Sequence, residues 1–256
     1  MDFTDRRVVI TGAAGVIGGW IAGAFARAGA RLCLSDIRAE ALGGRIAELG
    51  RDPETILLHA TDLMEESSVD ELVELVRRHW GAPDIVVNNA GVYPRGPRLV
   101  DLPLAEWDRI MGVNVRAPFL VSRGMARLMI ASGIGGTIIM IGSGAARQMR
   151  ATSVAYCTSK TAVERLAKGL ALELAPHRIR VNVVEPGFAP GSTASPLPED
   201  YVAKMRARIP LGRTSGPDDA SSAVLYLCSS VAGFITGAVL SVDGGNSIGT
   251  FEPSPG

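Results

Sequence analysis

Tyr156 and Lys160 are the residues of this sequence whose types and spacing most directly suggest chemistry. They begin an apolar-periodic run that ends near Pro176, and residues four apart on a helix stack on one face. A phenol titrates near ~10 and is a poor base at neutral pH, but a nearby ammonium stabilises the phenolate. A unit charge at ~4 Å in an effective dielectric near 20 contributes about 4 kcal/mol, enough to lower the tyrosine pKa by roughly two to three units. The pair could therefore exchange a proton with an alcohol or a ketone near neutral pH.

The same spacing also occurs by chance on many helices, so the elements around the pair decide whether it can act. Short apolar runs alternate with runs of helical periodicity along the chain. This alternation predicts βαβ units with right-handed crossovers and a parallel sheet covered on both faces. The expected strands are residues 7–11, 31–36, 55–60, 83–88, 137–141, 179–184 and 238–242. The expected helices are a first one ending near residue 28, then 39–49, 66–80, 104–131, the Tyr156 helix and a short piece near 200–207.

A glycine-rich loop with Gly12, Gly15 and Gly18 follows the first strand and opens a helix. Glycines let the backbone turn sharply and approach a ligand, and a helix N-terminus offers free N–H groups to a pyrophosphate. Asp36 ends the second strand, where a carboxylate in a dinucleotide fold accepts hydrogen bonds from the adenosine ribose and repels a 2′-phosphate. NAD is therefore favoured over NADP. Arg38 argues in the other direction, because a nearby guanidinium could accommodate the 2′-phosphate of NADP. Asp36 could also be an ordinary solvated turn residue without a role in cofactor binding.

Other polar residues lie at the expected carboxyl ends of strands, where parallel sheets bind ligands. The fourth strand ends in the Asn88–Gly91 segment, and the fifth delivers Ser143. Asn114 lies within the long helix at 104–131, and an asparagine there competes for backbone hydrogen bonds, so we expect a kink or a division into two helices. Residues 188–213 are rich in proline, glycine and serine, and a connection of this length predicts a lid or a binding loop.

Composition excludes several classes of protein. Lys and Arg number 26, as do Asp and Glu, so no net field attracts nucleic acid or an acidic membrane. The three cysteines and three histidines are scattered, so we expect neither a disulfide framework nor a metal site. Arg6 and Arg7 precede an apolar stretch as in an export signal, but glycines and Arg27 interrupt it, and no apolar run reaches the ~18 residues that span a bilayer. We expect one cytoplasmic domain at residues 1–249 with a tail at 250–256.

Taken in order, these motifs resemble the short-chain dehydrogenase/reductase superfamily, in its compact single-domain branch, over nearly the whole chain. The interval of 13 residues from Ser143 to Tyr156 is the usual one in that family. The resemblance implies an α/β fold with a single Rossmann-type doubly wound domain and a seven-stranded parallel sheet. The motifs that carry it are Thr11-Gly12…Gly18, Asp36, Asp62, Asn88-Asn89-Ala90-Gly91, Asn114, Ser143, Tyr156…Lys160, Pro186-Gly187, Ile209 to Arg213 and Asp243-Gly244-Gly245.

The resemblance also implies a role for each matching residue. Tyr156 would be the general acid/base, Lys160 would lower its pKa and hold the nicotinamide ribose, and Ser143 would hydrogen-bond the substrate oxygen. Asn114 would hold a water that links Lys160 to solvent. The implied cofactor contacts are Gly12, Ile17 and Gly18 at the pyrophosphate, Asp36 at the adenosine ribose, Asp62 and Leu63 at the adenine, Asn89, Ala90 and Gly91 along the groove, and Ala189 at the carboxamide.

We therefore expect an NAD(H)-dependent oxidoreductase that interconverts a secondary alcohol and a ketone. Two alternatives stay open: a 3-oxoacyl-thioester reductase that uses NADPH, and a non-catalytic NAD-binding interaction or sensor protein on the same fold. A hydrolase is disfavoured because Ser143 lacks a G-x-S-x-G elbow, and an epimerase or dehydratase usually needs a longer chain. Family habit implies a homotetramer or homodimer through the helices around residues 104–131 and 154–175.

The chain departs from the family pattern at three positions. Val16 stands where the compact branch usually has glycine, and the preceding residue is glycine instead, which alters the expected loop geometry. Gly191 stands where a threonine is frequent, so a hydroxyl contact there would come from Ser192 or Thr193, or would be absent. Glu185 precedes the Pro-Gly pair where a small residue is commoner, and it would either be solvated or face the substrate.

The substrate pocket is the least determined part of the sequence. Arginines at its expected border hint at an acidic or polar substrate, although surface arginines are common. The residues expected at this border are Tyr93, Arg95, Arg147, Arg150 and the 188–213 loop.

Overall fold

The computed structural model describes residues 1–50, 55–93, 96–191 and 196–251, with the side chains of 45–47 excepted. One sheet of seven parallel strands organises them, in the order β3-β2-β1-β4-β5-β6-β7. The strands are β1 (Arg7–Thr11), β2 (Arg31–Asp36), β3 (Ile56–Ala60), β4 (Ile85–Asn88), β5 (Gly136–Ile141), β6 (Ile179–Pro186) and β7 (Val239–Val242). The predicted doubly wound α/β fold is therefore confirmed. Three residues named in the sequence analysis, Arg95, Ser192 and Thr193, lie outside the described residues.

The central strands are buried on both faces. Val8, Val9 and Ile10 of β1 are all 0% exposed, as expected for a strand that helices cover above and below. Val9 lies opposite Cys33 of β2 on one side and Val86 of β4 on the other. The chain reverses its direction of winding beside β1, and ligands of such sheets bind at this switch point, beyond the carboxyl ends of the strands.

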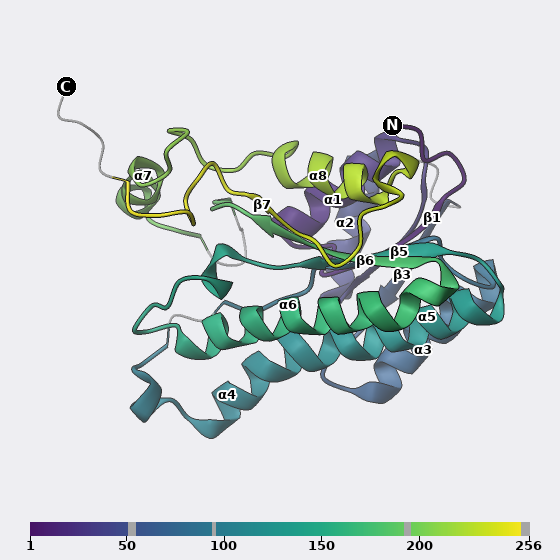
Figure 1. Ribbon diagram of the computed structural model, residues 1–256, viewed down its shortest axis with the longest axis horizontal. Coiled ribbons are helices and arrows are strands. Elements are labelled where there is room, and N and C mark those ends of the chain that lie inside the picture. The colour runs from purple at the N-terminus through teal and green to yellow at the C-terminus, as the bar shows by residue number, and fades with distance from the viewer. Residues whose placement is uncertain (51–54, 94–95, 192–195, 252–256) are drawn as a thin grey trace.

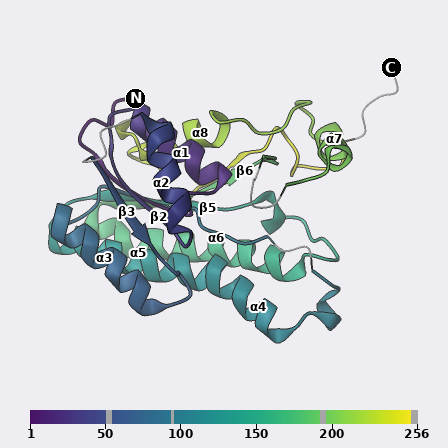
Figure 2. The ribbon, with the colours of Figure 1, turned by 180° about the vertical axis from the view of Figure 1, so that it is seen from behind.

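Helices form one layer on each face of the sheet (Figures 1 and 2). The first layer holds α1 (Val16–Arg27), α2 (Ala39–Leu49) and α8 (Asp219–Cys228), and the second holds α3 (Glu66–Trp80), α4 (Leu104–Met111), α5 (Ala117–Ala131) and α6 (Val154–Leu174). Each layer has its own apolar core, around Phe25 and Leu34 on the first side and around Leu72 and Met125 on the second. The two cores fix how the helices lie on the sheet, and therefore where their ends meet.

The helix expected at 104–131 is interrupted. A π-helical segment, η3 (Gly112–Arg116), separates α4 from α5 and contains Asn114. A π-helical turn inserts one residue into the helix and displaces the backbone hydrogen bonds around it. The predicted irregularity near Asn114 is therefore confirmed as a local change of helix type.

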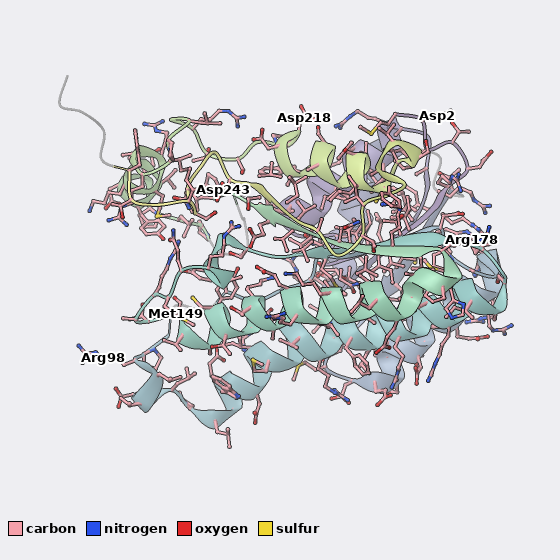
Figure 3. All side chains as sticks on the ribbon, viewed as in Figure 1. Asp2, Arg98, Met149, Arg178, Asp218 and Asp243 are labelled. Atoms are coloured by element: carbon pink, nitrogen blue, oxygen red, sulfur yellow. The ribbon has the colours of Figure 1, made fainter. Side chains whose placement is uncertain are left out.

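The two ends of the sheet lie at opposite ends of the molecule. Figure 3 shows Asp243 and Met149 near the end where the strands finish, and Arg178, which precedes β6, at the other end. Helix α7 (Glu199–Ala207) also lies at the end where the strands finish, inside the connection expected to form a lid or binding loop. No helix in the described part of the chain is both long and apolar enough to cross a membrane.

Candidate active site

Four separate segments carry the residues predicted to act. Gly91 follows β4, Asn114 lies in η3, Ser143 follows β5, and Tyr156 and Lys160 lie in the first two turns of α6. Strand ends and helix starts meet here because the parallel sheet directs all of its carboxyl ends to one edge.

Lys160 is buried, with 6% of its surface exposed, and its Nζ donates to the carbonyl oxygen of Ile141 at 2.9 Å. A Cβ placed on Gly91 would lie 3.6 Å from Lys160 Nζ and 3.4 Å from Asn114 Oδ1, so these three residues are neighbours. Burial lowers the pKa of Lys160 to about 8, because the charged ammonium loses its hydration. An amine in this state is poised to gain or lose a proton near neutral pH.

Asn114 acts as a clamp between two segments. Its Oδ1 accepts from the Val92 amide at 2.8 Å, and its Nδ2 donates to the Val92 carbonyl at 3.0 Å and to Ser159 Oγ at 2.9 Å. Ser159 Oγ in turn donates to the Tyr156 carbonyl at 2.7 Å. The loop after β4 is thereby tied to the first two turns of α6. The water expected at Asn114 stays a prediction.

The environment of Tyr156 differs from the one expected. Burial raises the pKa of Tyr156, and the hydrogen bond with Ser143 and the charge of Arg150 offset this only in part. Lys160 Nζ lies 5.8 Å from the centre of the Tyr156 ring and is directed at the Ile141 carbonyl, so the expected lowering of the pKa by Lys160 is wrong for this arrangement. The Tyr93 ring meets the Tyr156 ring edge to face, with centroids 4.6 Å apart, so Tyr93 borders the site as predicted.

Ser143 is oriented by its own loop. Its side-chain oxygen accepts from the Ala145 amide at 3.2 Å at the start of the short helix η4 (Gly144–Ala146). That oxygen already accepts one hydrogen bond, and the Ser143 hydroxyl can donate its hydrogen to the Tyr156 oxygen, with which it is hydrogen-bonded.

Gly12 and Gly18 allow two backbone segments to cross closely. Gly12 has φ +65°, and a Cβ there would lie 2.7 Å from Ala90 Cα, while a Cβ on Gly18 would collide with the Gly12 carbonyl oxygen. Asn89 Nδ2 donates to the Thr11 and Gly12 carbonyls at 2.9 and 3.0 Å. These glycines therefore serve the packing of the loop as well as the ligand approach expected of them.

The N-terminus of α1 fits a pyrophosphate. Its N-cap is Gly15, which has no side chain to accept a hydrogen bond from the first-turn amides. These amides, that of Ile17 among them, can therefore bind an anion. Val16 begins the helix without disturbing it, so the altered glycine spacing still yields a helix start. The carboxylate oxygens nearby belong to Asp36 and are engaged by donors.

Asp36 is buried, with 7% exposed, rather than a solvated turn residue. Its Oδ2 accepts from the Ala14 amide at 3.0 Å, and its Oδ1 accepts from Arg38 N and Nε at 3.1 and 3.2 Å. Asp36 and Arg38, the residues that the sequence sets against each other in the choice between NAD and NADP, therefore form an ion pair. Asp62, at the end of the neighbouring strand, accepts from the Met64 amide at 2.9 Å, and the adjacent Leu63 is half-buried.

Glu185 is fully buried and is therefore not solvated, contrary to one of the two expectations. Its Oε2 lies 2.6 Å from Arg147 Nη2 and accepts from Ser241 Oγ at 2.8 Å. Arg147 is consequently tied to this carboxylate, whereas Arg150 is close enough to influence Tyr156. No pattern in the sequence indicates this ion pair, because Arg147 lies in a loop and Glu185 in a separate strand.

Tyr156 borders a small hollow, whereas a wider one lies away from the predicted site residues. A small cavity of about 10 Å³, lined by Leu102, Ile110, Thr152 and Tyr156 among others, is near the volume of one water. A wider surface hollow of about 580 Å³ lies beside α3, and none of the predicted site residues lines it. Among the described residues, no group of three or more His, Cys, Asp or Glu side chains could hold a metal ion.

Comparisons with known proteins agree with this geometry. Residues 12–247 match the family model described as Enoyl-(Acyl carrier protein) reductase. The chain is 32% identical to the sorbitol dehydrogenase of Cereibacter sphaeroides, over 96% of this chain and 99% of that protein.

Solved structures agree as well. A short-chain type dehydrogenase/reductase from Mycobacterium marinum superposes with a TM-score of 0.86 at 35% identity, covering 97% of both chains. A 3-ketoacyl-(acyl-carrier-protein) reductase from Brucella melitensis, complexed with NADH, superposes with a TM-score of 0.85 at 34% identity, covering 95% of this chain and 99% of that one. The chain therefore belongs to the short-chain dehydrogenase/reductase superfamily of oxidoreductases.

Proposed function

We propose that this protein interconverts a secondary alcohol and a ketone, with NAD(H) as the hydride carrier. The observation that carries the proposal is the convergence of Ser143, Tyr156, Lys160 and Asn114 from three segments at the edge where ligands of parallel sheets bind. The related sorbitol dehydrogenase acts, by its name, on sorbitol, which is a polyol. When bound, the nicotinamide supplies hydride transfer, and the protein must manage the proton on the substrate oxygen.

Tyr156 and Ser143 would do this together. Ser143 orients the substrate oxygen. The Tyr156 phenol gives a proton to that oxygen in reduction, and the Tyr156 phenolate takes the proton from it in oxidation. The raised pKa of Tyr156 keeps the phenol protonated, which suits the reductive direction in this arrangement. Lys160, with its pKa lowered to about 8, could resupply protons and hold the ribose hydroxyls.

The glycine loop, Asp36 and the Asn89–Gly91 segment support a dinucleotide as the cofactor. The crossing at Gly12 and Gly18, and the open N-terminus of α1, provide a cradle for the pyrophosphate. We propose contacts of Asp62 and Leu63 with the adenine and of Ala189 with the carboxamide. The buried carboxylate of Asp36 would repel a 2′-phosphate, which favours NAD.

A second candidate function is reduction of a 3-oxoacyl thioester with NADPH. The matching family model and the Brucella melitensis structure bear names of acyl-carrier-protein reductases. The pairing of Arg38 with Asp36 weighs against NADPH, because the guanidinium is already neutralised. A 3-oxoacyl thioester is therefore one of the substrates to be compared.

The test mixes purified protein with NAD⁺ and a panel of polyols and other secondary alcohols, and separately with NADH or NADPH and ketones or 3-oxoacyl thioesters. Formation or loss of reduced-nicotinamide absorbance is the readout. Tight NAD binding without turnover of any substrate would favour a binding or sensor protein instead.

Tyr156→Phe is the first variant to make. We expect turnover to fall by about 10²- to 10⁴-fold, the range of a general acid/base, with NAD affinity little changed. Calorimetric titration with NAD and initial rates measure the two effects. Near-normal rates in Tyr156→Phe would remove the phenol from the mechanism.

We also propose a single catalytic domain at residues 1–249, with residues 188–213 as the substrate loop, and assembly into a homotetramer or homodimer through α4, α5 and α6. Apolar side chains on these helices are exposed, among them Leu104, Phe119 and Ile130. Light scattering of the eluting protein measures the assembly state, and a monomer would contradict the proposal.

A further inference from the structure

A second cluster of charged side chains lies behind the Ser143 loop. Glu185 is 0% exposed, and no described residue donates a hydrogen bond to its Oε1. Its Oε2, by contrast, is held by Arg147 Nη2 at 2.6 Å and by Ser241 Oγ at 2.8 Å. Buried polar oxygens without partners are rare, so the bare Oε1 requires an explanation.

Glu164 supplies that explanation. It lies on α6, eight residues after Tyr156 and four after Lys160, and its Oε1 is likewise buried without a donor among the described residues. The carboxyl groups of Glu164 and Glu185 lie within hydrogen-bonding reach of each other. Two carboxylates at this separation resist joint ionisation, whereas one proton between them makes the two bare oxygens a donor and an acceptor.

The surrounding charges match a singly protonated pair. The charged groups that face Glu164 are Glu185 from β6, Arg147 from the Ser143 loop and Lys168 from α6 itself. Burial and then Glu185 raise the pKa of Glu164, and the two cations offset this only in part. One guanidinium in contact with one carboxylate and one neutral acid leaves little net charge in the buried part of the cluster.

Arg147 connects this pair to the candidate active site. It ends the turn that begins at Ser143, and its Nη2 also donates to Ser241 Oγ at 2.7 Å and Ser247 Oγ at 2.6 Å. The cluster therefore joins α6, β6 and β7 to the loop that carries Ser143. A change in its charge would reach Ser143 through Arg147.

We propose that Glu164 and Glu185 share one proton and, through Arg147, hold the Ser143 loop in position against Tyr156. Both glutamates are positioning residues, because they act through Arg147 on Ser143. The effect on turnover rests on the proposed function, whereas the shared proton does not.

The pH dependence follows from the raised pKa of Glu164. The stability that its proton contributes is fully present below the unfolded pKa of 4.5 and is lost as pH rises through the folded pKa. Above that pH the second negative charge repels Glu185 and loosens the loop. Glu164→Gln keeps a hydrogen-bond donor but cannot ionise, so it should remove this loss.

Infrared spectroscopy tests the proton directly at neutral pH. We expect a protonated-carboxyl band in the wild type, shifted by exchange into heavy water, that is lost in both Glu164→Gln and Glu185→Gln. Glu173→Gln, an exposed position on the same helix, is the matched control and should keep the band. A wild type without this band, or a band that persists in Glu164→Gln, would overturn the shared proton even if the protein proves to have no dehydrogenase activity.

Steady-state kinetics and thermal unfolding across pH test the positioning. We expect Glu164→Ala to lower kcat/KM for the alcohol about tenfold with NAD affinity unchanged, since small displacements of catalytic groups have effects of at least this size. Glu164→Gln should restore the rate, and its melting temperature should fall less than that of the wild type between acid and alkaline pH. Equal rates in Glu164→Ala and the wild type, or parallel pH profiles of stability in Glu164→Gln and the wild type, would contradict the positioning role.

Discussion

Lys160 combines a candidate catalytic role with a cost in stability. Its pKa is lowered from 10.5 to about 8 because the ammonium is buried, so the folded state binds its proton less tightly than the unfolded state does. This difference destabilises the folded protein by about 3 kcal/mol at neutral pH. The cost disappears as pH rises from about 8 to 10.5, where the folded protein has already lost the proton.

We therefore expect Lys160→Met to be more stable than the wild type at pH 7, by on the order of 2 kcal/mol once about 1 kcal/mol is subtracted for the lost bond to the Ile141 carbonyl. The gain should shrink toward pH 10, while activity is lost at both. Urea unfolding at the two pH values measures it, with the exposed Lys204→Met as control. A less stable Lys160→Met at pH 7 would mean that the buried ammonium is better compensated than its surroundings indicate.

Asp36 sets up a second prediction at the scale of single residues. The carboxylate is buried and holds both the Ala14 amide and Arg38, so its removal frees the guanidinium for a phosphate. Asp36→Ala should shift the ratio of NADP to NAD efficiency by about tenfold or more toward NADP, equivalent to about 1.4 kcal/mol. The double variant with Arg38→Ala should lose part of this shift. An unchanged ratio in Asp36→Ala would place cofactor choice in other residues.

Among the elements, η3 and the start of α6 depend on each other through Asn114. Its amide makes three hydrogen bonds to Val92 and Ser159, and removing them leaves partly buried backbone groups of Val92 without these partners. Asn114→Ala should lower the free energy of unfolding by about 1 to 3 kcal/mol and reduce kcat, because the loop carrying Gly91 is released. Ser159→Ala, which removes only one of these partners, should cost less in both measurements. A larger effect of Ser159→Ala would contradict the clamp.

How well the sequence predicts an element depends on what stabilises that element. The helix expected at 66–80 matches α3 because one of its faces is buried and the other is solvated, which gives a clear period. Helix α8 is not among the predicted helices, although Ala220, Val224 and Leu227 lie at helical spacing and are all buried. Its ten residues follow a long irregular connection, and an apolar pattern over so few residues does not distinguish a helix from the loop before it.

Contacts between elements are harder to predict. Motif spacing brought Ser143, Tyr156 and Lys160 to one edge of the sheet, as the structure has them. The direction of the Lys160 ammonium toward Ile141, and the meeting of Glu164 with Glu185, depend on how α6 packs on the sheet, and one sequence contains no pattern for either. Long-range pairs of this kind are therefore found only from coordinates.

For the whole molecule, a stabilising network lies at the end of the sheet where the strands begin, and the candidate active site lies at the end where they finish. Where the strands begin, Asp84 Oδ2 accepts from Arg7 N and Nε at 2.9 and 2.7 Å, and Arg7 Nη1 donates to the Trp80 carbonyl at 2.8 Å. This network ties the starts of β1 and β4 to the end of α3, far from Tyr156. Burial would raise the pKa of Asp84, but the hydrogen bonds and charge of Arg7 outweigh it, so the pKa is lowered.

A carboxylate with a lowered folded pKa stabilises the protein above its unfolded pKa of 3.8 and loses that contribution as pH falls through the folded value. Asp84→Asn should therefore be less stable than the wild type at pH 7 by about 1 to 3 kcal/mol. The difference should be smaller at an acidic pH below 3.8. Its kcat and KM should stay unchanged, because the network lies at the opposite end from the substrate. Urea unfolding at both pH values and initial rates measure this, with the exposed Asp70→Asn as control. A fall in kcat of Asp84→Asn at a temperature where it is fully folded would show that the two ends are coupled.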